Sequence, residues 1–168
     1  MEQNNNLLTD PIEILMAEHE AGLSQLAELD KAILFIEANG FDDESISKIK
    51  IAISFINDEI RFHNEKEEIH LFPLLAKHVT GPTMVMEHEH RELWDAFTKL
   101  KILMEQNDKI YFELNKENIV NTSKFIIELL SSHIYKENNI LFPMAKNSLT
   151  KEEYKICSDG IFKATNKN

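Results

Sequence analysis

Apolar residues recur every three or four positions along most of the chain and seldom alternate with polar ones. The pattern is clearest in the second quarter, where it runs through Ile49, Ile53, Ile56, Ile60, Leu71 and Leu74. This spacing places apolar side chains on one face of a helix. Because the chain has only 4 Gly and 4 Pro, few positions interrupt helices. The pattern predicts an all-α fold.

Glycine, proline and capping residues divide this pattern into four long helices. Asp10-Pro11 predicts the N-cap and first residue of the first helix, and breaks are expected at Gly40, at Gly81 and in the polar stretch 107–115. Apolar positions predicted for the third helix are Met84, Val85, Leu93, Leu100 and Leu103.

Four helices joined by short connections most simply form an antiparallel up-and-down four-helix bundle. The bundle is expected to cover about 10–148 and to consist of two repeated helical hairpins. Thr150 with Glu153 predicts the cap of a short C-terminal helix over about 150–162. We expect a single domain over residues 1–168.

The charge balance and the single cysteine exclude several classes of function. With 18 basic and 29 acidic residues the net charge is −11, which disfavours nucleic acid and anionic membrane surfaces as partners. The polar start at residues 1–6 lacks the features of a signal peptide, and no run of apolar residues is long enough for a membrane span. We therefore expect a soluble, cytoplasmic protein. The single cysteine, Cys157, cannot form an internal disulfide and cannot hold an iron–sulfur cluster by itself.

A motif of metal-ligand residues occurs twice, 70 positions apart. His63 and Glu67 are followed by Leu-Phe-Pro, and so are His133 and Glu137. A Glu-His pair precedes each motif by a similar interval, Glu18-His19 in the first copy and Glu87-His88 in the second. The repetition predicts two equivalent sets of ligands.

The residue types and their spacing suit a two-metal centre. A His and a Glu four positions apart lie on one helical face, so the imidazole can bind one metal while the carboxylate spans to a second. Two His, two bridging carboxylate oxygens and a shared oxide or hydroxide give each metal five ligands and one open position. Imidazole with carboxylate suits iron, manganese or zinc, and a redox-active pair favours iron. The predicted ligands are His19, His63, Glu67, His88, His133 and Glu137.

The alternative is that these polar groups simply bond to one another. A lone His-x-x-x-Glu is more often a hydrogen-bonded pair, but six buried polar groups without partners would each cost about 1–3 kcal/mol. Three further residues are candidates as extra ligands or as partners of ligands: His70, Glu59 and Glu92. His90 is predicted to lie on the wrong face to join His88, His78 to lie at the surface, and Glu18 and Glu87 to face solvent or support a neighbouring ligand.

These motifs resemble the hemerythrin-like proteins with a His-His-Glu cation-binding domain, over roughly Asp10 to Ser148. The resemblance implies a non-haem di-iron site with four terminal His ligands and two bridging glutamates, Glu67 and Glu137. Oxygen-carrying hemerythrins have a second His one turn after the ligand of the third helix, where this chain has Glu92. It is therefore more similar to the four-His branch, which includes proteins linked to iron–sulfur cluster repair and to nitric oxide or peroxide handling.

The expected function is a di-iron centre that binds or reduces a small ligand, O2, NO or H2O2, in oxidative or nitrosative stress. The small molecule and a redox partner protein are the expected partners. Whether the centre is an enzyme is left open. The alternatives are a reversible oxygen carrier or sensor, and an iron-sensing or iron-donating module for iron–sulfur repair.

Overall fold

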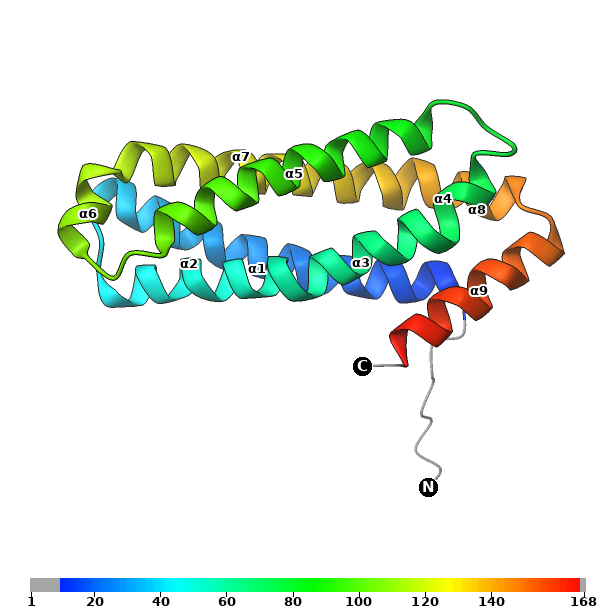
Figure 1. Cartoon of the computed structure of the whole chain (residues 1–168), viewed down its shortest axis with the longest axis horizontal. Helices are drawn as coiled ribbons and strands as arrows, with labels where there is room; N and C mark the ends of the chain where they lie inside the picture. Colours follow the sequence, from blue (N-terminus) through cyan, green and yellow to red (C-terminus); the bar gives the residue numbers. More distant parts are fainter. Residues whose placement is uncertain (1–9, 167–168) are drawn as a thin grey trace, which may run out of the picture.

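The computed structural model describes residues 10–166, and this range consists of helices and connecting turns without a strand (Figure 1). The polar start at residues 1–6 lies outside the described residues. The all-α prediction is confirmed. Helices α1, α2, α5 and α7 lie side by side, with contacts between α1 and α2, α1 and α7, α5 and α7, and α2 and α5. These contacts join the four helices into a bundle.

Two of the four helical paths through the bundle are broken into shorter segments. The first path is α1 (Pro11–Asn39), and the third is α5 (Pro82–Met104). The second path comprises α2 (Asp43–Phe55), the π-helix η1 (Ile56–Ile60), α3 (Arg61–Lys66), the π-helix η2 (Glu67–Leu71) and α4 (Phe72–Leu75). The fourth comprises α7 (Lys116–Lys136), the π-helix η3 (Glu137–Leu141) and α8 (Phe142–Ser148), and the short helix α6 (Lys109–Leu114) lies in the connection before it. The terminal helix α9 covers Lys151–Thr165.

The capping residues act largely as the sequence predicts. The Asp10 carboxylate accepts hydrogen bonds from two backbone N–H groups in the first turn of α1. Gly40 ends α1 with a φ of 81°, a conformation that favours glycine. Thr150 and Glu153 form a capping box for α9, which extends to Thr165 rather than to residue 162.

The expected turn at 107–115 contains the short helix α6. The Asp108 side chain caps it by accepting a hydrogen bond from the backbone N–H of Ile110, and Phe112 anchors it in the core. A buried aromatic side chain thus orders a stretch that its polar composition predicts to be a turn.

The buried face of α5 differs from the predicted one. Met84 and Val85 are exposed, and Leu103 is only partly buried. The buried positions step regularly by three or four: Thr83, Met86, His90, Leu93, Phe97, Leu100 and Met104. Residues five positions apart do not share a helical face, so a stripe that includes Leu93 passes through position 90 and not through position 88.

The apolar core is divided into two clusters. One lies around Leu29, Ile33, Ile56, Phe97 and Leu130, among others, and the second around Leu15, Phe72, Met86, Phe142 and Ile161, among others. Along each of the four helical paths a buried His lies near the change from residues of one cluster to residues of the other. The two apolar clusters therefore have a polar layer between them.

The π-helices η2 and η3 occupy equivalent places in the repeat. Each begins at the motif Glu and ends just before the Phe-Pro pair. Pro73 and Pro143 lack the backbone N–H that an α-helical ladder would use, and a π turn accommodates this loss. Single π turns are frequent at functional sites.

Helix α9 packs against α1, α3 and η2, all in the first half of the repeat. In Figure 1 it lies along the end of the bundle where α1 begins. Its buried residues Cys157 and Ile161 belong to the apolar cluster at that end. The helix therefore completes the core there.

Candidate metal centre

Six buried polar side chains meet in the layer between the two apolar clusters. They form two overlapping groups, whose potential ligand atoms lie within 4.8 Å of one another in each group. The first group is His19, His63, Glu67 and Glu137, and the second is Glu67, His90, His133 and Glu137. Both carboxylates thus belong to both groups.

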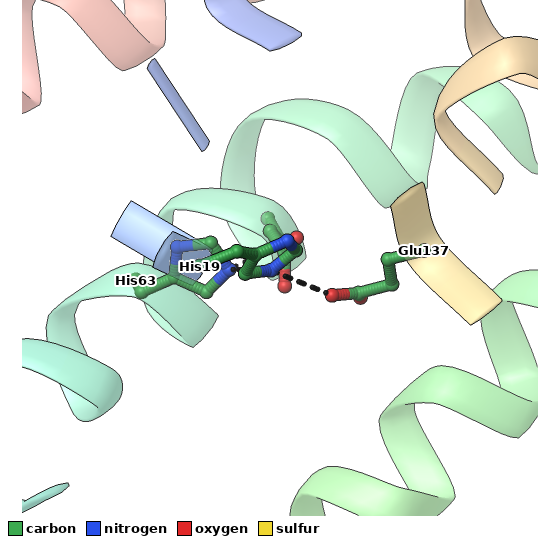
Figure 2. Close-up of side chains that lie close together, drawn as sticks. His19, His63 and Glu137 are labelled. Carbon is green, nitrogen blue, oxygen red and sulfur yellow. Dashed lines mark hydrogen bonds and ion pairs between the residues drawn. The ribbon is translucent and has the colours of Figure 1, made fainter. Parts of the chain in front are cut away.

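The imidazoles meet in pairs through their Nε2 atoms. In the first group His19 Nε2 lies 3.0 Å from His63 Nε2, and in the second His90 Nε2 lies 3.1 Å from His133 Nε2. Figure 2 shows His19 between His63 and Glu137, with its ring directed at both. The Nε2 atoms of each pair converge on one point.

Each carboxylate offers one oxygen to each group. Glu137 Oε2 lies 3.1 Å from His19 Nε2 and its Oε1 lies 3.1 Å from His133 Nε2. Glu67 Oε1 lies 3.3 Å from His63 Nε2 and its Oε2 lies 3.6 Å from His90 Nε2. This arrangement suits two carboxylates that bridge two metal ions.

The cluster fits metal ions better than it fits a network of hydrogen bonds. All four oxygens of Glu67 and Glu137 are buried, and none accepts a hydrogen bond from the described residues. Such groups cost free energy unless an ion satisfies them. Ligands at right angles, each about 2.1 Å from a metal, lie about 3.0 Å apart, which matches the spacing of the Nε2 atoms.

The outward nitrogen of two His residues of the cluster is held by a Glu–Lys pair. His63 Nδ1 lies 2.7 Å from Glu18 Oε2, and Lys66 binds the other oxygen of Glu18. His133 Nδ1 lies 2.9 Å from Glu89 Oε2, and Lys136 binds the other oxygen of Glu89. Because an ionised carboxylate can only accept, Nδ1 donates, and the lone pair of a neutral ring then lies on Nε2.

The other two His ligands have their partners in the opposite half of the repeat. His19 Nδ1 lies 2.7 Å from Asn138 Oδ1, and His90 Nδ1 lies 2.6 Å from Glu68 Oε1. Asn138 directly follows Glu137, and Glu68 directly follows Glu67. All four imidazoles therefore have an outer partner that fixes the ring, as metal-binding His residues usually do.

The charges in the cluster shift its pKa values strongly in the metal-free protein. Burial lowers the pKa of His63, but the Glu67 and Glu18 carboxylates outweigh it and raise the pKa to about 10. Burial likewise lowers the pKa of His133, and Glu137 with Glu89 raises it to about 9. Burial alone would raise the pKa of Glu67, yet the His63 imidazolium holds it well below its usual value. In the metal-free cluster the His63 and His133 imidazoles thus hold protons at neutral pH.

The prediction that His88 lies in the cluster is wrong, and His90 takes that place. The His88 side chain is 64% exposed, whereas His90 is 1% exposed. Two Glu-His pairs follow each other here, and the second, Glu89-His90, is the true counterpart of Glu18-His19. The regular apolar stripe through Leu93 was the signal that could have chosen between them. Glu89, whose role the sequence did not reveal, supports His133.

The three extra candidates lie outside both groups. His70 is half-buried against Gly160 of α9, Glu59 is exposed, and exposed Glu92 lies 3.8 Å from His88. His78 is partly exposed and pairs with Glu153 at 2.7 Å. One turn after His90 the chain has Trp94, just as it has Glu92 one turn after His88. The second His expected at this place in oxygen-carrying hemerythrins is therefore absent for either choice of ligand.

A surface hollow of about 300 Å³ approaches the outer side of His19. Ile12, Met16, Asn138, Phe142 and Lys146 contribute to its lining. Asn138 bonds to His19, and the Phe142 ring stacks on the His19 ring with 5.4 Å between ring centroids. Two side chains therefore stand between this hollow and the cluster.

No helix within residues 10–166 has the length and apolar character to cross a membrane.

Comparison with known proteins connects this geometry to a family. The family described as the hemerythrin HHE cation binding domain matches residues 10–145. The chain is 33% identical over 102 residues to the iron-sulfur cluster repair protein YtfE of Musicola paradisiaca, which covers 55% of this chain and 44% of that protein. It is 28% identical over 141 residues to YtfE of Enterobacter sp., which covers 79% of this chain and 63% of that protein. The chain thus spans less than two thirds of these relatives.

Proposed function

This chain belongs to the hemerythrin family of HHE cation-binding domains, and on that premise we propose that its buried cluster holds two iron ions. One ion would be held by His19 and His63, the other by His90 and His133. Glu67 and Glu137 would bridge them. The observation that carries the proposal is the placement of the two carboxylates, each of which offers one buried, unbonded oxygen to each pair of imidazoles.

The proposed activity is the binding or reduction of a small ligand, O2, NO or H2O2. Iron would supply redox chemistry and an open coordination position. The protein holds the imidazoles in place through the partners on Nδ1 and surrounds the cluster with two apolar layers that exclude bulk water. The hollow of about 300 Å³ approaches the outer side of His19, and the Asn138 and Phe142 side chains separate it from the cluster. A buried cluster behind two side chains supports a small ligand rather than a large one.

A second candidate is a part in iron–sulfur cluster repair, with iron donated from the centre. It is favoured by the similarity to proteins named for that repair. The two candidates differ in where the iron goes. A catalyst keeps both ions through repeated exposure to peroxide or NO, whereas a donor loses iron to an apo iron–sulfur protein that is incubated with it.

Metal analysis of paired variants tests the two-iron proposal. Fully loaded wild-type protein is expected to contain two iron ions per chain, measured by elemental analysis. His90→Gln should lose at least one of them because a ligand is missing. His88→Gln is the matched control, two positions away and exposed, and should retain both. One ion in the wild type, or equal losses in the two variants, would contradict the proposal.

The ligand is tested with the diferrous protein prepared without oxygen. Rapid mixing with O2 or peroxide should oxidise it to a stable diferric form with a new absorption spectrum, and NO should give a distinct spectrum. An oxygenated spectrum that reverses on degassing would instead support the carrier or sensor alternative.

A further inference from the structure

The outer partners of the four His ligands break the symmetry of the centre. Five pairs of equivalent positions carry the same residue type in both halves: Glu18 and Glu89, His19 and His90, His63 and His133, Lys66 and Lys136, Glu67 and Glu137. The sixth pair differs, because Glu68 in the first half corresponds to Asn138 in the second. This single difference lies directly against two of the imidazoles.

The hydrogen bonds of Glu68 and Asn138 cross between the halves, so each of these two residues acts on the metal position formed by the His residues of the other half. Glu68 of the first half accepts from His90 of the second half, at 2.6 Å. Asn138 of the second half accepts from His19 of the first, at 2.7 Å. The His90–His133 position therefore has two outer carboxylates, Glu68 and Glu89, whereas the His19–His63 position has one.

A carboxylate and an amide have unequal effects on an imidazole ligand. A negatively charged acceptor on Nδ1–H draws the proton away from the ring and makes Nε2 the better electron donor. An amide oxygen has the same geometry but no net charge. His90 is consequently the stronger ligand of the pair His90 and His19.

The nearby cations add to this difference. Lys66, beside the His19–His63 position, is 1% exposed, so its positive charge is little screened by water. Lys136, its counterpart beside His133, has a side chain that is 31% exposed, and solvent weakens its field. The first position thus has one fewer carboxylate and the less screened cation.

We propose that the two metal positions are unequal and that the His90–His133 position binds a metal ion first. The same imbalance stabilises the more highly charged ion there when the two irons differ in oxidation state. The inference rests on the proposed two-metal function and adds an order to it. Loss of one outer partner typically changes metal affinity by 10- to 100-fold. Because Glu68 is partly exposed, we expect about a tenfold difference between the positions.

Zinc titration of metal-free protein with ¹⁵N-labelled histidine tests the order, because binding shifts the nitrogen signals of the ligating rings. Glu68→Gln identifies the His90 signals and Asn138→Asp those of His19, since each substitution changes one direct partner. In the wild type, the His90 signals should change mainly over the first equivalent of zinc. Those of His19 should change mainly over the second.

The two isosteric substitutions should also change the order. Glu68→Gln removes the extra carboxylate and Asn138→Asp supplies one to the other position, so each should bring the two steps within about threefold of each other. Glu68→Gln combined with Asn138→Asp should reverse the order. Glu59→Gln, which removes an exposed glutamate outside the cluster, is the control and should leave the order unchanged.

The outcomes separate this inference from the function on which it rests. Two zinc ions that bind in the expected order, with reversal in the double variant, support both. Two ions that bind without order, or in an order that the double variant does not alter, overturn the inference and leave the two-metal centre standing. A total of one ion overturns both.

Discussion

Gly160 gives a sensitive test of how α9 packs on the bundle. A Cβ added at this position would lie 2.4 Å from Nδ1 of His70 and 2.8 Å from Cγ of the same ring. Contacts this short require the ring or the helix to move, and overpacking of this kind costs about 1–3 kcal/mol. Alanine is the better helix former by about 1 kcal/mol, which offsets part of the cost. Gly160→Ala should therefore destabilise the protein by about 1 kcal/mol.

The sign of the effect should change when the His70 ring is removed. In a His70→Ala background the clash disappears and only the gain in helix propensity remains, so Gly160→Ala should stabilise the protein by up to about 1 kcal/mol. The coupling free energy between the two substitutions is then about 2 kcal/mol, within the range for residues in contact.

Urea denaturation of the four metal-free proteins measures this cycle, with the midpoints compared at equal slopes. Equal effects of Gly160→Ala in both backgrounds would refute the packing of His70 against α9. Metal content gives an independent check. His70→Ala should still bind two ions, because His70 belongs to neither ligand group.

Three further predictions concern other groups. In the metal-free protein the pKa of His63 is raised to about 10 and that of His133 to about 9, from an ordinary value near 6.5. The two protonated rings therefore stabilise the fold fully below about pH 6.5, and because this effect is lost as the pH rises through 9 to 10, the thermal midpoint should fall between pH 9 and 10. Burial and, to a smaller extent, Asp10 raise the pKa of Cys157 to about 12, so at pH 8 the thiol should react with iodoacetamide far more slowly in native than in urea-unfolded protein. Glu18→Gln leaves the buried Lys66 without a carboxylate and should lower the free energy of unfolding in urea by about 2 kcal/mol, whereas Glu89→Gln should lower it by under about 1 kcal/mol because Lys136 reaches solvent. Equal losses in the two variants would contradict the role of burial.

The helical bundle could be predicted because its signals are local. Caps at Asp10 and Thr150, the glycine at position 40 and the spacing of apolar residues each depend on neighbours a few positions away. The π-helices could not be predicted in the same way. Pro73 and Pro143 account for η2 and η3 but not for η1, and proline alone does not distinguish a π turn from a kink.

Five of the six residues that meet in the buried cluster are among the predicted ligands, and the sixth shows what a motif alone does not decide. Two adjacent Glu-His pairs have the same residues at positions 87–88 and 89–90, and they differ only in the helical face on which each His lies, which the apolar stripe through Leu93 marks. The outer partners were harder still. Glu68 and Asn138 lie on the far half of the repeat from the His residues that they contact, and that relation exists only in the folded bundle.

The polar layer between the two apolar clusters has a consequence for how the molecule opens. With metal bound, the layer ties all four helical paths together, and the bundle should exchange its amide hydrogens as one cooperative unit. Without metal the interactions that hold the four helical paths together at this layer weaken. The end that contains α9 should then exchange through partial opening at a lower free energy than the end around Ile33 and Leu130, so metal occupancy sets whether the protein behaves as one folding unit or two.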